Sequence, residues 1–334
     1  MRVLSLFDGM SCGRISLDNL GVDCEYYASE IDKYATKVSE ANYPDIIRLG
    51  DVTKWKEWDI DWNFDLLLGG SPCQGFSFAG KQLAFDDPRS ALFFVYVDIL
   101  NHIKSVNPNV KFLLENVRMK KEFLQVITDQ LGVEPVIINS ALLSAQNRVR
   151  FYWCNWQVEQ PQDKGILLKD IIEQAETERD KSHCIDANYH KGATWEQYKT
   201  KHRRQQVLCN QVGIASDIKG NDSIKRIYAT DGKSPCLTTM GGGHREPKVL
   251  RDKSQTILST IYKENAKSMV TRKKHGLLVE LDKTQYRKLT PLECERLQTV
   301  PDNYTNHVSN TQRYKMLGNG WTVDVISHIL KGAL

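Results

Sequence analysis

The chain has 334 residues, of which 41% are hydrophobic and 26% are charged, and its formal net charge is +4. This composition is typical of globular proteins and excludes collagen-like and disordered chains. No apolar run approaches the roughly 18 residues of a membrane-spanning helix, so we expect no membrane partner. Eight cysteines occur without a Cys-x-x-Cys pair, which argues against a zinc site or a disulfide framework. We therefore expect no metal and a cytoplasmic location.

Basic residues are concentrated in one part of the chain. Residues 181–280 contain 19 Lys and Arg against 9 Asp and Glu, a net charge of +10, which leaves −6 for the remainder. A basic segment beside an acidic one indicates an anionic macromolecular partner, with nucleic acid as the first candidate. A solvated lysine-rich surface would give the same count, so composition alone leaves both interpretations open.

The first three predicted strands are each followed or ended by an acidic residue. Strands are predicted at residues 3–7, 26–30 and 47–51, with helices at 14–20 and 33–42. The first turn lacks the Gly-x-Gly-x-x-Gly spacing of dinucleotide sites, and Asp8 would repel a pyrophosphate. Asp8, Glu30 and Asp51 together favour a nucleoside that carries a positive sulfonium. Taken singly, each is equally well interpreted as an ordinary strand-end acid.

A thiol follows the fourth predicted strand. The apolar run that begins at residue 66 stops at two glycines, and Cys73 comes directly after Pro72. This spacing predicts Cys73 at the carboxyl end of a parallel strand, where open α/β sheets bind their ligands. A lone cysteine is usually a small buried side chain, so its role depends on its neighbours. The polar stretch 74–89 has the length of a functional loop.

Further polar groups are predicted at the same edge of the sheet. After a helix at 91–103, strands are predicted at 112–117, 136–139 and 150–153, and Glu115 lies near the end of the first of these. Arg148 and Arg150 are two residues apart, so on an extended chain their side chains share a face. A plain strand-end acid and surface arginines are the alternatives. Beside a cysteine, the set is more typical of an anion or carbonyl clamp.

The regular pattern breaks down between residues 157 and 281 and resumes near the C-terminus. Thr290 and Glu293 form a capping box with Pro291 at the first helical position, and residues 321–330 predict an amphipathic helix. The order of elements predicts an α/β fold, with a doubly wound, mostly parallel sheet and an inserted domain.

These motifs, in this order, resemble the cytosine-C5 DNA methyltransferases over nearly the whole chain. The matching blocks are Phe7-Asp-Gly9, Glu30, Asp51, Gly70-Ser-Pro-Cys-Gln74, Glu115-Asn-Val117, Gln146-Asn-Arg-Val-Arg150, residues 287–301 and Gly318-Asn-Gly-Trp321. Two blocks depart from the usual bacterial pattern, because Ser11 and Cys12 replace glycines and Gly320-Trp321 replaces Ser-Val. Both are more similar to the animal de novo DNA methyltransferases. Because this sequence contains none of the chromatin-reading domains of those animal enzymes, we expect a stand-alone enzyme of a bacterial cell or a phage-infected host.

The resemblance implies the fold of S-adenosylmethionine-dependent methyltransferases, with a catalytic domain at 1–164 completed by 286–334 and a target-recognition domain at 165–285. It implies methyl transfer from S-adenosylmethionine to cytosine C5 within a specific DNA sequence, on a base flipped out of the duplex. Cys73 would attack C6, Glu115 would act at N3, Arg150 with Arg148 would bind O2, and residues 74–89 would close as a lid. The implied cofactor contacts are Phe7, Asp8, Gly9, Met10, Cys12, Glu30, Ile31, Asp51, Val52, Pro72, Leu92, Asn319 and Trp321. Double-stranded DNA is the expected partner, and a cognate restriction endonuclease is a candidate second one.

Three alternative functions remain. A cytosine-C5 tRNA methyltransferase of the same fold would use Cys73, Glu115 and Arg150 equally well, although that family's Cys-Phe-Thr signature is missing and the basic insert favours duplex DNA. A catalytically inactive DNA-binding relative would have no use for this set of residues. A nicotinamide dehydrogenase would need the phosphate-binding glycines that the first turn lacks.

Overall fold

The structure, a computed structural model, describes residues 1–72, 91–173, 175–177, 179–192, 194–201, 204–209, 211–214, 226–228, 248–249 and 286–334. The chain divides into two compact units. The first comprises Met1–Ile171, Arg179–Gln205 and Leu289–Leu334, and the second comprises Ile172–Glu178 and Gln206–Lys288. Cys73 and the predicted lid 74–89 lie outside the described residues, as does most of the basic segment 181–280. The domain boundaries and roles inferred from the sequence remain predictions.

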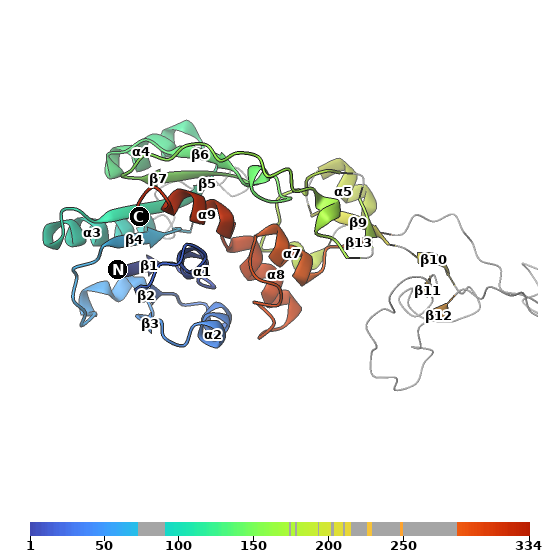
Figure 1. Ribbon diagram of the computed structural model, residues 1–334, viewed down its shortest axis with the longest axis horizontal. Helices are drawn as coiled ribbons and strands as arrows, with labels where there is room; N and C mark the ends of the chain where they lie inside the picture. The colour runs from blue at the N-terminus through green and yellow to red at the C-terminus, as the bar shows by residue number, and fades with distance from the viewer. Residues whose placement is uncertain are drawn as a thin grey trace, which may run out of the picture. The chain divides into compact units, whose positions relative to one another are not determined.

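The first unit is built on a seven-stranded sheet with the order β3-β2-β1-β4-β5-β7-β6 (Figure 1). Its strands are β1 (Arg2–Leu6), β2 (Glu25–Ser29), β3 (Ile47–Arg48), β4 (Leu66–Gly69), β5 (Lys111–Val117), β6 (Val136–Asn139) and β7 (Val149–Cys154). Strands β1 to β5 pair in parallel, whereas β7 runs antiparallel to both β5 and β6. The near-continuous apolar runs are those of strands buried on both faces. The predicted α/β fold with a mostly parallel sheet is confirmed.

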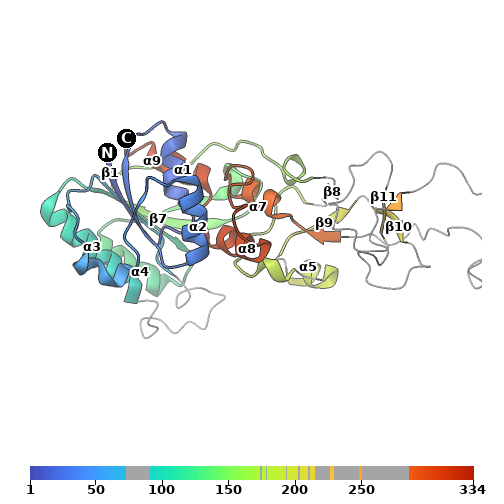
Figure 2. The ribbon, with the colours of Figure 1, turned by 90° about the horizontal axis from the view of Figure 1, so that it is seen from below.

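Helices cover both faces of this sheet (Figure 2). On one face, α3 (Ala91–Val106) and α4 (Lys121–Leu131) pack against strand residues that include Leu67, Phe112 and Trp153. On the other face, α1 (Cys12–Asn19) and α9 (Val323–Leu330) pack against residues that include Leu68 and Tyr152. Neighbouring residues of one strand thus enter opposite cores, as the two-residue period of a strand requires. The sheet is therefore doubly wound.

The remaining helices of the first unit include two that the sequence predicted and others that it did not. They are α2 (Lys33–Asn42), η1 (Val52–Glu57), η3 (Ser140–Leu142), η4 (Leu168–Asp170), η5 (Tyr189–Lys191), α5 (Trp195–Lys201), α7 (Pro291–Leu297) and α8 (Asn310–Asn319). The predicted capping box begins α7, since the Thr290 hydroxyl accepts from the Glu293 amide at 3.1 Å and the Glu293 carboxylate accepts from the Thr290 amide at 2.7 Å. Helices α4, α5 and α8 are absent from the sequence prediction.

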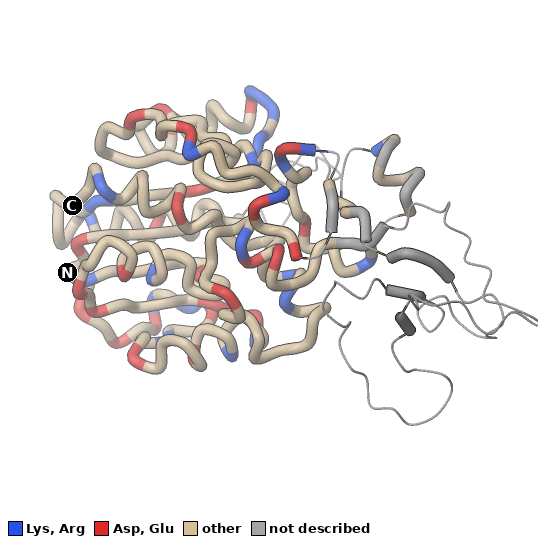
Figure 3. The backbone as a smooth tube through the Cα atoms, turned by 45° about the vertical axis from the view of Figure 1, so that its right-hand side comes forward, with Lys and Arg blue, Asp and Glu red and all other residues tan. Residues whose placement is uncertain are grey.

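The second unit contains two small sheets, each of three described strands. One has the order β13-β9-β8 and the other β10-β11-β12, with β8 (Ala175–Glu176), β9 (Gln206–Cys209), β10 (Gln211–Ile214), β11 (Arg226–Tyr228), β12 (Lys248–Val249) and β13 (Tyr286–Lys288). In the first unit, acidic and basic residues are interspersed along the chain, with no regular alternation (Figure 3). None of the helices in the described ranges is long and apolar enough to span a bilayer.

Candidate active site

A cavity of about 540 Å³ lies at the carboxyl ends of β1, β2, β4 and β5, within the first unit. Its volume is typical of a site for a small organic ligand. Fifteen of the residues predicted for catalysis or cofactor binding line it: Phe7, Asp8, Gly9, Cys12, Glu30, Ile31, Asp51, Val52, Pro72, Leu92, Glu115, Arg148, Arg150, Asn319 and Trp321. Of the other two, Cys73 lies outside the described residues, and Met10 is not part of the wall. The structure therefore brings the described candidates together, while their individual roles remain predictions.

The turn after β1 is held in an unusual backbone conformation. Phe7, Gly9 and Ser11 all have positive φ angles, of 57°, 61° and 66°. Such angles cost about 1–3 kcal/mol at a residue other than glycine and persist only where the surroundings impose them. Here the Gly9 amide donates to the Glu30 carboxylate at 2.8 Å, and the Tyr304 hydroxyl donates to the Met10 carbonyl at 2.7 Å. The turn exposes Phe7 to the cavity and buries the Met10 side chain, which is 1% exposed.

Three carboxylates at strand ends face the cavity, and each has a different environment. Burial raises the pKa of the Asp8 carboxyl, although hydrogen bonds from Ser11 and Tyr26 at 2.6 and 2.8 Å oppose this effect. Glu30 accepts from the backbone amides of Gly9, Ile31 and Asp32. Asp51 caps η1, and hydrogen bonds from the amide and hydroxyl of Thr53 lower its pKa. Of these three acids, Asp8 is the one whose ionised form is disfavoured by burial, so a positively charged ligand group would stabilise it.

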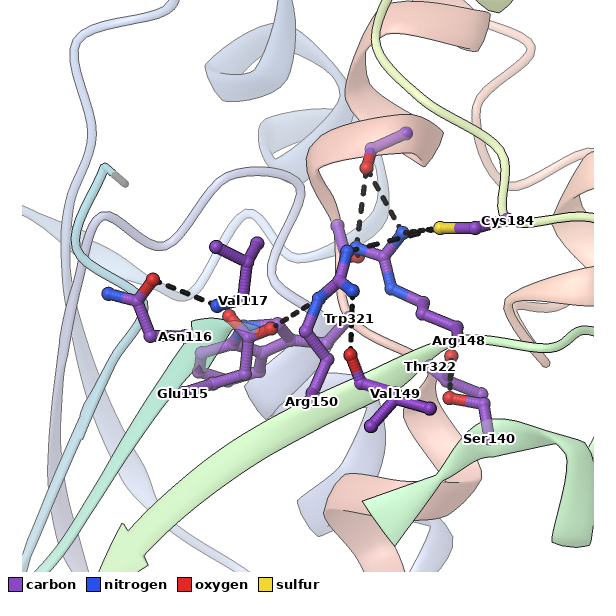
Figure 4. A network of polar contacts seen from close by, with 12 residues as sticks. Glu115, Asn116, Val117, Ser140, Arg148, Val149, Arg150, Cys184, Trp321 and Thr322 are labelled. Atoms are coloured by element: carbon purple, nitrogen blue, oxygen red, sulfur yellow. Dashed lines mark hydrogen bonds and ion pairs between the residues drawn. The ribbon is translucent and has the colours of Figure 1, made fainter. Parts of the chain in front are cut away.

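Glu115 is clamped on both of its oxygens (Figure 4). Arg150 Nε lies 3.0 Å from Oε1, and the Trp321 indole N–H donates to Oε2 at 3.2 Å. The Arg150 and Glu115 side chains are 14% and 11% exposed, so the ion pair is shielded from water. The pairing follows from the sheet, because β5 and β7 are antiparallel neighbours and Val117 lies opposite Arg150. The arginine therefore reaches diagonally across to the strand-end acid.

Arg148 lies beside Arg150 but has different partners. Its guanidinium donates to the carbonyls of Gly318 at 3.3 Å, Gly320 at 2.9 Å and Ile185 at 3.3 Å. The residue is only 4% exposed. The guanidinium therefore holds the segment 318–320 in place, and this segment carries Asn319 into the cavity wall.

Cys184 is a residue near this site that sequence reasoning missed. Its sulfur accepts from Arg148 at 3.4 Å and lies 4.0 Å from Arg150 Nη2 (Figure 4). Burial alone would raise the pKa of this thiol, but the two guanidinium groups outweigh burial and lower it. By contrast, burial raises the pKa of the Cys12 thiol to about 12. No sequence signal marks Cys184, because it is 34 residues from Arg150 and belongs to no recognisable spacing.

Gly70 and Lys315 are among the wall residues that the prediction did not include. Gly70 would, with a Cβ atom, place that atom 3.0 Å from Trp321 Nε1 and 3.4 Å from Glu115 Oε2. Lys315, on α8, lines the cavity and binds Asp32 at 2.6 Å. Gly70 opens the matching block Gly70-Ser-Pro-Cys-Gln74 but was given no role in the site, whereas α8 has too weak an apolar pattern. Within the described ranges, no group of three or more His, Cys, Asp or Glu is arranged to hold a metal ion.

Comparison with known proteins gives the family. The model of the C-5 cytosine-specific DNA methylases matches residues 1–333. The orphan methyltransferase M.SPBetaI of Bacillus phage SPbeta is 28% identical, with 99% of this chain and 97% of the relative covered. The type II methyltransferase M.HpaII of Haemophilus parainfluenzae is 31% identical over 97% of this chain and 86% of its own. A solved structure, a DNMT2 mutant from Spodoptera frugiperda, is similar in fold, with a TM-score of 0.53, 22% identity and 99% of both chains covered. The chain therefore belongs to the C-5 cytosine-specific DNA methylases and is a DNA (cytosine-5-)-methyltransferase.

Proposed function

We propose that this enzyme methylates C5 of a flipped-out cytosine in a specific sequence of double-stranded DNA, through a covalent bond between Cys73 and C6. The observation that carries the proposal is the Glu115–Arg150 pair in the wall of a cavity that Glu30 and Asp51 also line. Glu115 and Arg150, which can bind a pyrimidine ring, thus share one cavity with Glu30 and Asp51, which can bind a nucleoside.

The cavity fits S-adenosylmethionine as the methyl donor. Glu30, at the end of β2, is suited to accept from ribose hydroxyls, and Asp51 is suited to accept from an adenine amino group. Asp8 supplies a buried carboxylate that a positive sulfonium group would stabilise. Phe7, Leu92 and Trp321 provide apolar surface in the same wall. When bound, S-adenosylmethionine supplies an electrophilic methyl group.

The residues of the chain activate the cytosine. The Cys73 thiolate bonds to C6 while Glu115, in its protonated form, donates a hydrogen bond to N3 and stabilises the charge that develops on the ring. Arg150 binds O2 and orients the base. After C5 has taken the methyl group, loss of the C5 proton to water re-forms the C5–C6 double bond and expels the Cys73 thiolate. Pro72, directly before Cys73, lines the cavity, which supports this assignment.

Purified enzyme is expected to transfer labelled methyl groups from S-adenosylmethionine to duplex DNA, and bisulfite sequencing of host DNA after expression is expected to reveal one recognition sequence. Label in tRNA alone would contradict the proposal. The named relatives include both a type II and an orphan methyltransferase, so the partner endonuclease stays a prediction.

Two substitutions test the assigned chemistry. Glu115→Gln is expected to lower the single-turnover rate about 10²–10⁴-fold, the usual contribution of a positioned acid. Cys73→Ser is expected to lower it by orders of magnitude while cofactor affinity is retained. Glu122→Gln is the matched control, because Glu122 is an exposed residue of α4 that pairs with Lys120. Full activity of Cys73→Ser would contradict the covalent mechanism, and full activity of Glu115→Gln would contradict the role of Glu115 at N3.

A further inference from the structure

Trp321 lines the cavity and lies close to Gly70, which follows β4, and to Glu115 of β5. It precedes α9 and follows the segment that Arg148 holds. Its indole N–H donates to Glu115 Oε2 at 3.2 Å (Figure 4). A Cβ atom on Gly70 would lie 3.0 Å from the indole nitrogen and 3.3 Å from Cζ2. Glycine at position 70 thus allows the indole to approach the backbone and reach the carboxylate.

The hydrogen bond completes the orientation of Glu115. Arg150 holds Oε1 from one side, and Trp321 holds Oε2 from the other. A carboxylate that is held on one oxygen only can still rotate about its last bond, because terminal sp³–sp² torsions are broad. The directional hydrogen bond from Trp321 to the other oxygen restricts this rotation. The plane of the carboxyl group is then fixed before any substrate arrives.

We infer that Trp321 is a positioning residue for Glu115, in addition to lining the cavity: its indole N–H orients the acid that acts on the cytosine ring. This inference rests on the proposed function of Glu115. Catalysis is sensitive to such orientation, since displacement of a reacting group by about 1 Å can lower a rate 10²-fold. Loss of the N–H alone is therefore expected to lower the chemical rate without removing the apolar wall against which a ligand packs.

Trp321→Phe isolates the N–H, because phenylalanine keeps an aromatic ring but has no donor. A net hydrogen bond to a charged group corresponds to roughly a tenfold to hundredfold change in rate. We expect single-turnover methyl transfer to fall by this factor, while the Kd for S-adenosylmethionine, measured by calorimetry, changes less than threefold. The matched control is Trp156→Phe, which removes an indole N–H that donates to the Ile329 carbonyl at 2.9 Å, away from the cavity lining. The control is expected to keep the wild-type rate.

The outcomes separate this inference from the proposed function. Suppose that the wild-type enzyme methylates DNA, that Glu115→Gln is inactive and that Trp321→Phe retains the full rate. In that case the proposed function stands and only the inference about Trp321 is wrong. A weakened Kd with an unchanged saturating rate would also overturn it, because the indole would then serve the cofactor alone. If Trp321→Phe fails to fold, Gly70→Ala replaces it, since the added methyl group would lie 3.0 Å from the indole nitrogen and require the indole to shift, whereas its distance of 3.4 Å to Glu115 Oε2 is ordinary contact. A reduced saturating rate in that variant supports the inference, and a wild-type rate refutes it.

Discussion

The substitution Arg148→Met tests whether Arg148 serves the protein or the substrate. Methionine retains an apolar stem of similar reach but removes every N–H donor. Because the arginine is 4% exposed, water cannot replace those donors without entering the site. The carbonyls of Gly318, Gly320 and Ile185 would each lose a charged partner.

The expected loss of stability follows from these contacts. Hydrogen bonds to a charged group contribute about 1.5–3 kcal/mol each, and leaving a buried partner unsatisfied costs a similar amount. The Gly320 carbonyl still accepts from Gln298 at 3.2 Å, so the three contacts do not add fully. We expect the free energy of unfolding to fall by about 3–5 kcal/mol. Cofactor affinity should also fall, since Asn319 would lose its fixed position in the wall.

Urea unfolding and calorimetric titration with S-adenosylmethionine measure the two quantities. Lys121→Met is the control, because Lys121 is an exposed residue of α4, and its change should lie within about 0.5 kcal/mol of zero. Wild-type stability and cofactor affinity in Arg148→Met, together with a loss of methyl transfer, would refute the reasoning. Arg148 would then contact the base, as the family resemblance suggests.

Two further predictions concern a buried ion pair and a perturbed thiol. Arg313→Met would leave the fully buried Glu295 carboxylate without its cation, so the free energy of unfolding measured in urea should fall by about 3–5 kcal/mol. Lys164→Met is the control, because it breaks an ion pair with Asp324 in which the lysine is half exposed, and its loss should be less than about 1 kcal/mol. Equal losses of stability in the two variants would contradict this account. The thiolate is the form that reacts with iodoacetamide, so at pH 7 Cys184 should be alkylated faster than Cys12, whose pKa is raised to about 12. As the pH falls through the lowered pKa of Cys184, its labelling rate should fall; equal rates by mass spectrometry at the two positions would show that the guanidinium groups do not stabilise its thiolate.

The sheet was predictable because its strands are short apolar runs bounded by glycines or acids. The carboxyl ends of parallel strands meet at one edge, so the order of residues along the chain was enough to assign Asp8, Glu30, Asp51 and Glu115 to a common site. Helices α4 and α8 were both missed, although Phe123, Ile127 and Leu131 of α4 recur every four residues, the spacing of an amphipathic helix. Helix α8 is largely polar in sequence, yet it buries Arg313 through the carboxylate of Glu295, a contact that only the tertiary structure supplies.

Side-chain direction was the part of the site that local pattern could not decide. Met10 lies two residues after Asp8, but the positive φ angles of the turn bury its side chain while Phe7, Asp8 and Gly9 line the cavity. Arg148 and Arg150 were expected to act together because their spacing puts them on one face of a strand. The strand β7 begins only at Val149, so Arg148 precedes it and the alternation rule does not extend that far.

The different partners of the two arginines explain how one strand end can serve both structure and chemistry. Arg150 lies within the strand and meets Glu115 on the neighbouring strand, so its position is as rigid as the sheet. Arg148 lies just before the strand and binds the carbonyls of residues 318–320, which lead directly into Trp321. Trp321 in turn donates to Glu115. The two arginines therefore reach the same carboxylate by separate routes, one directly and one through the indole, and a change at either position should disturb the same acid.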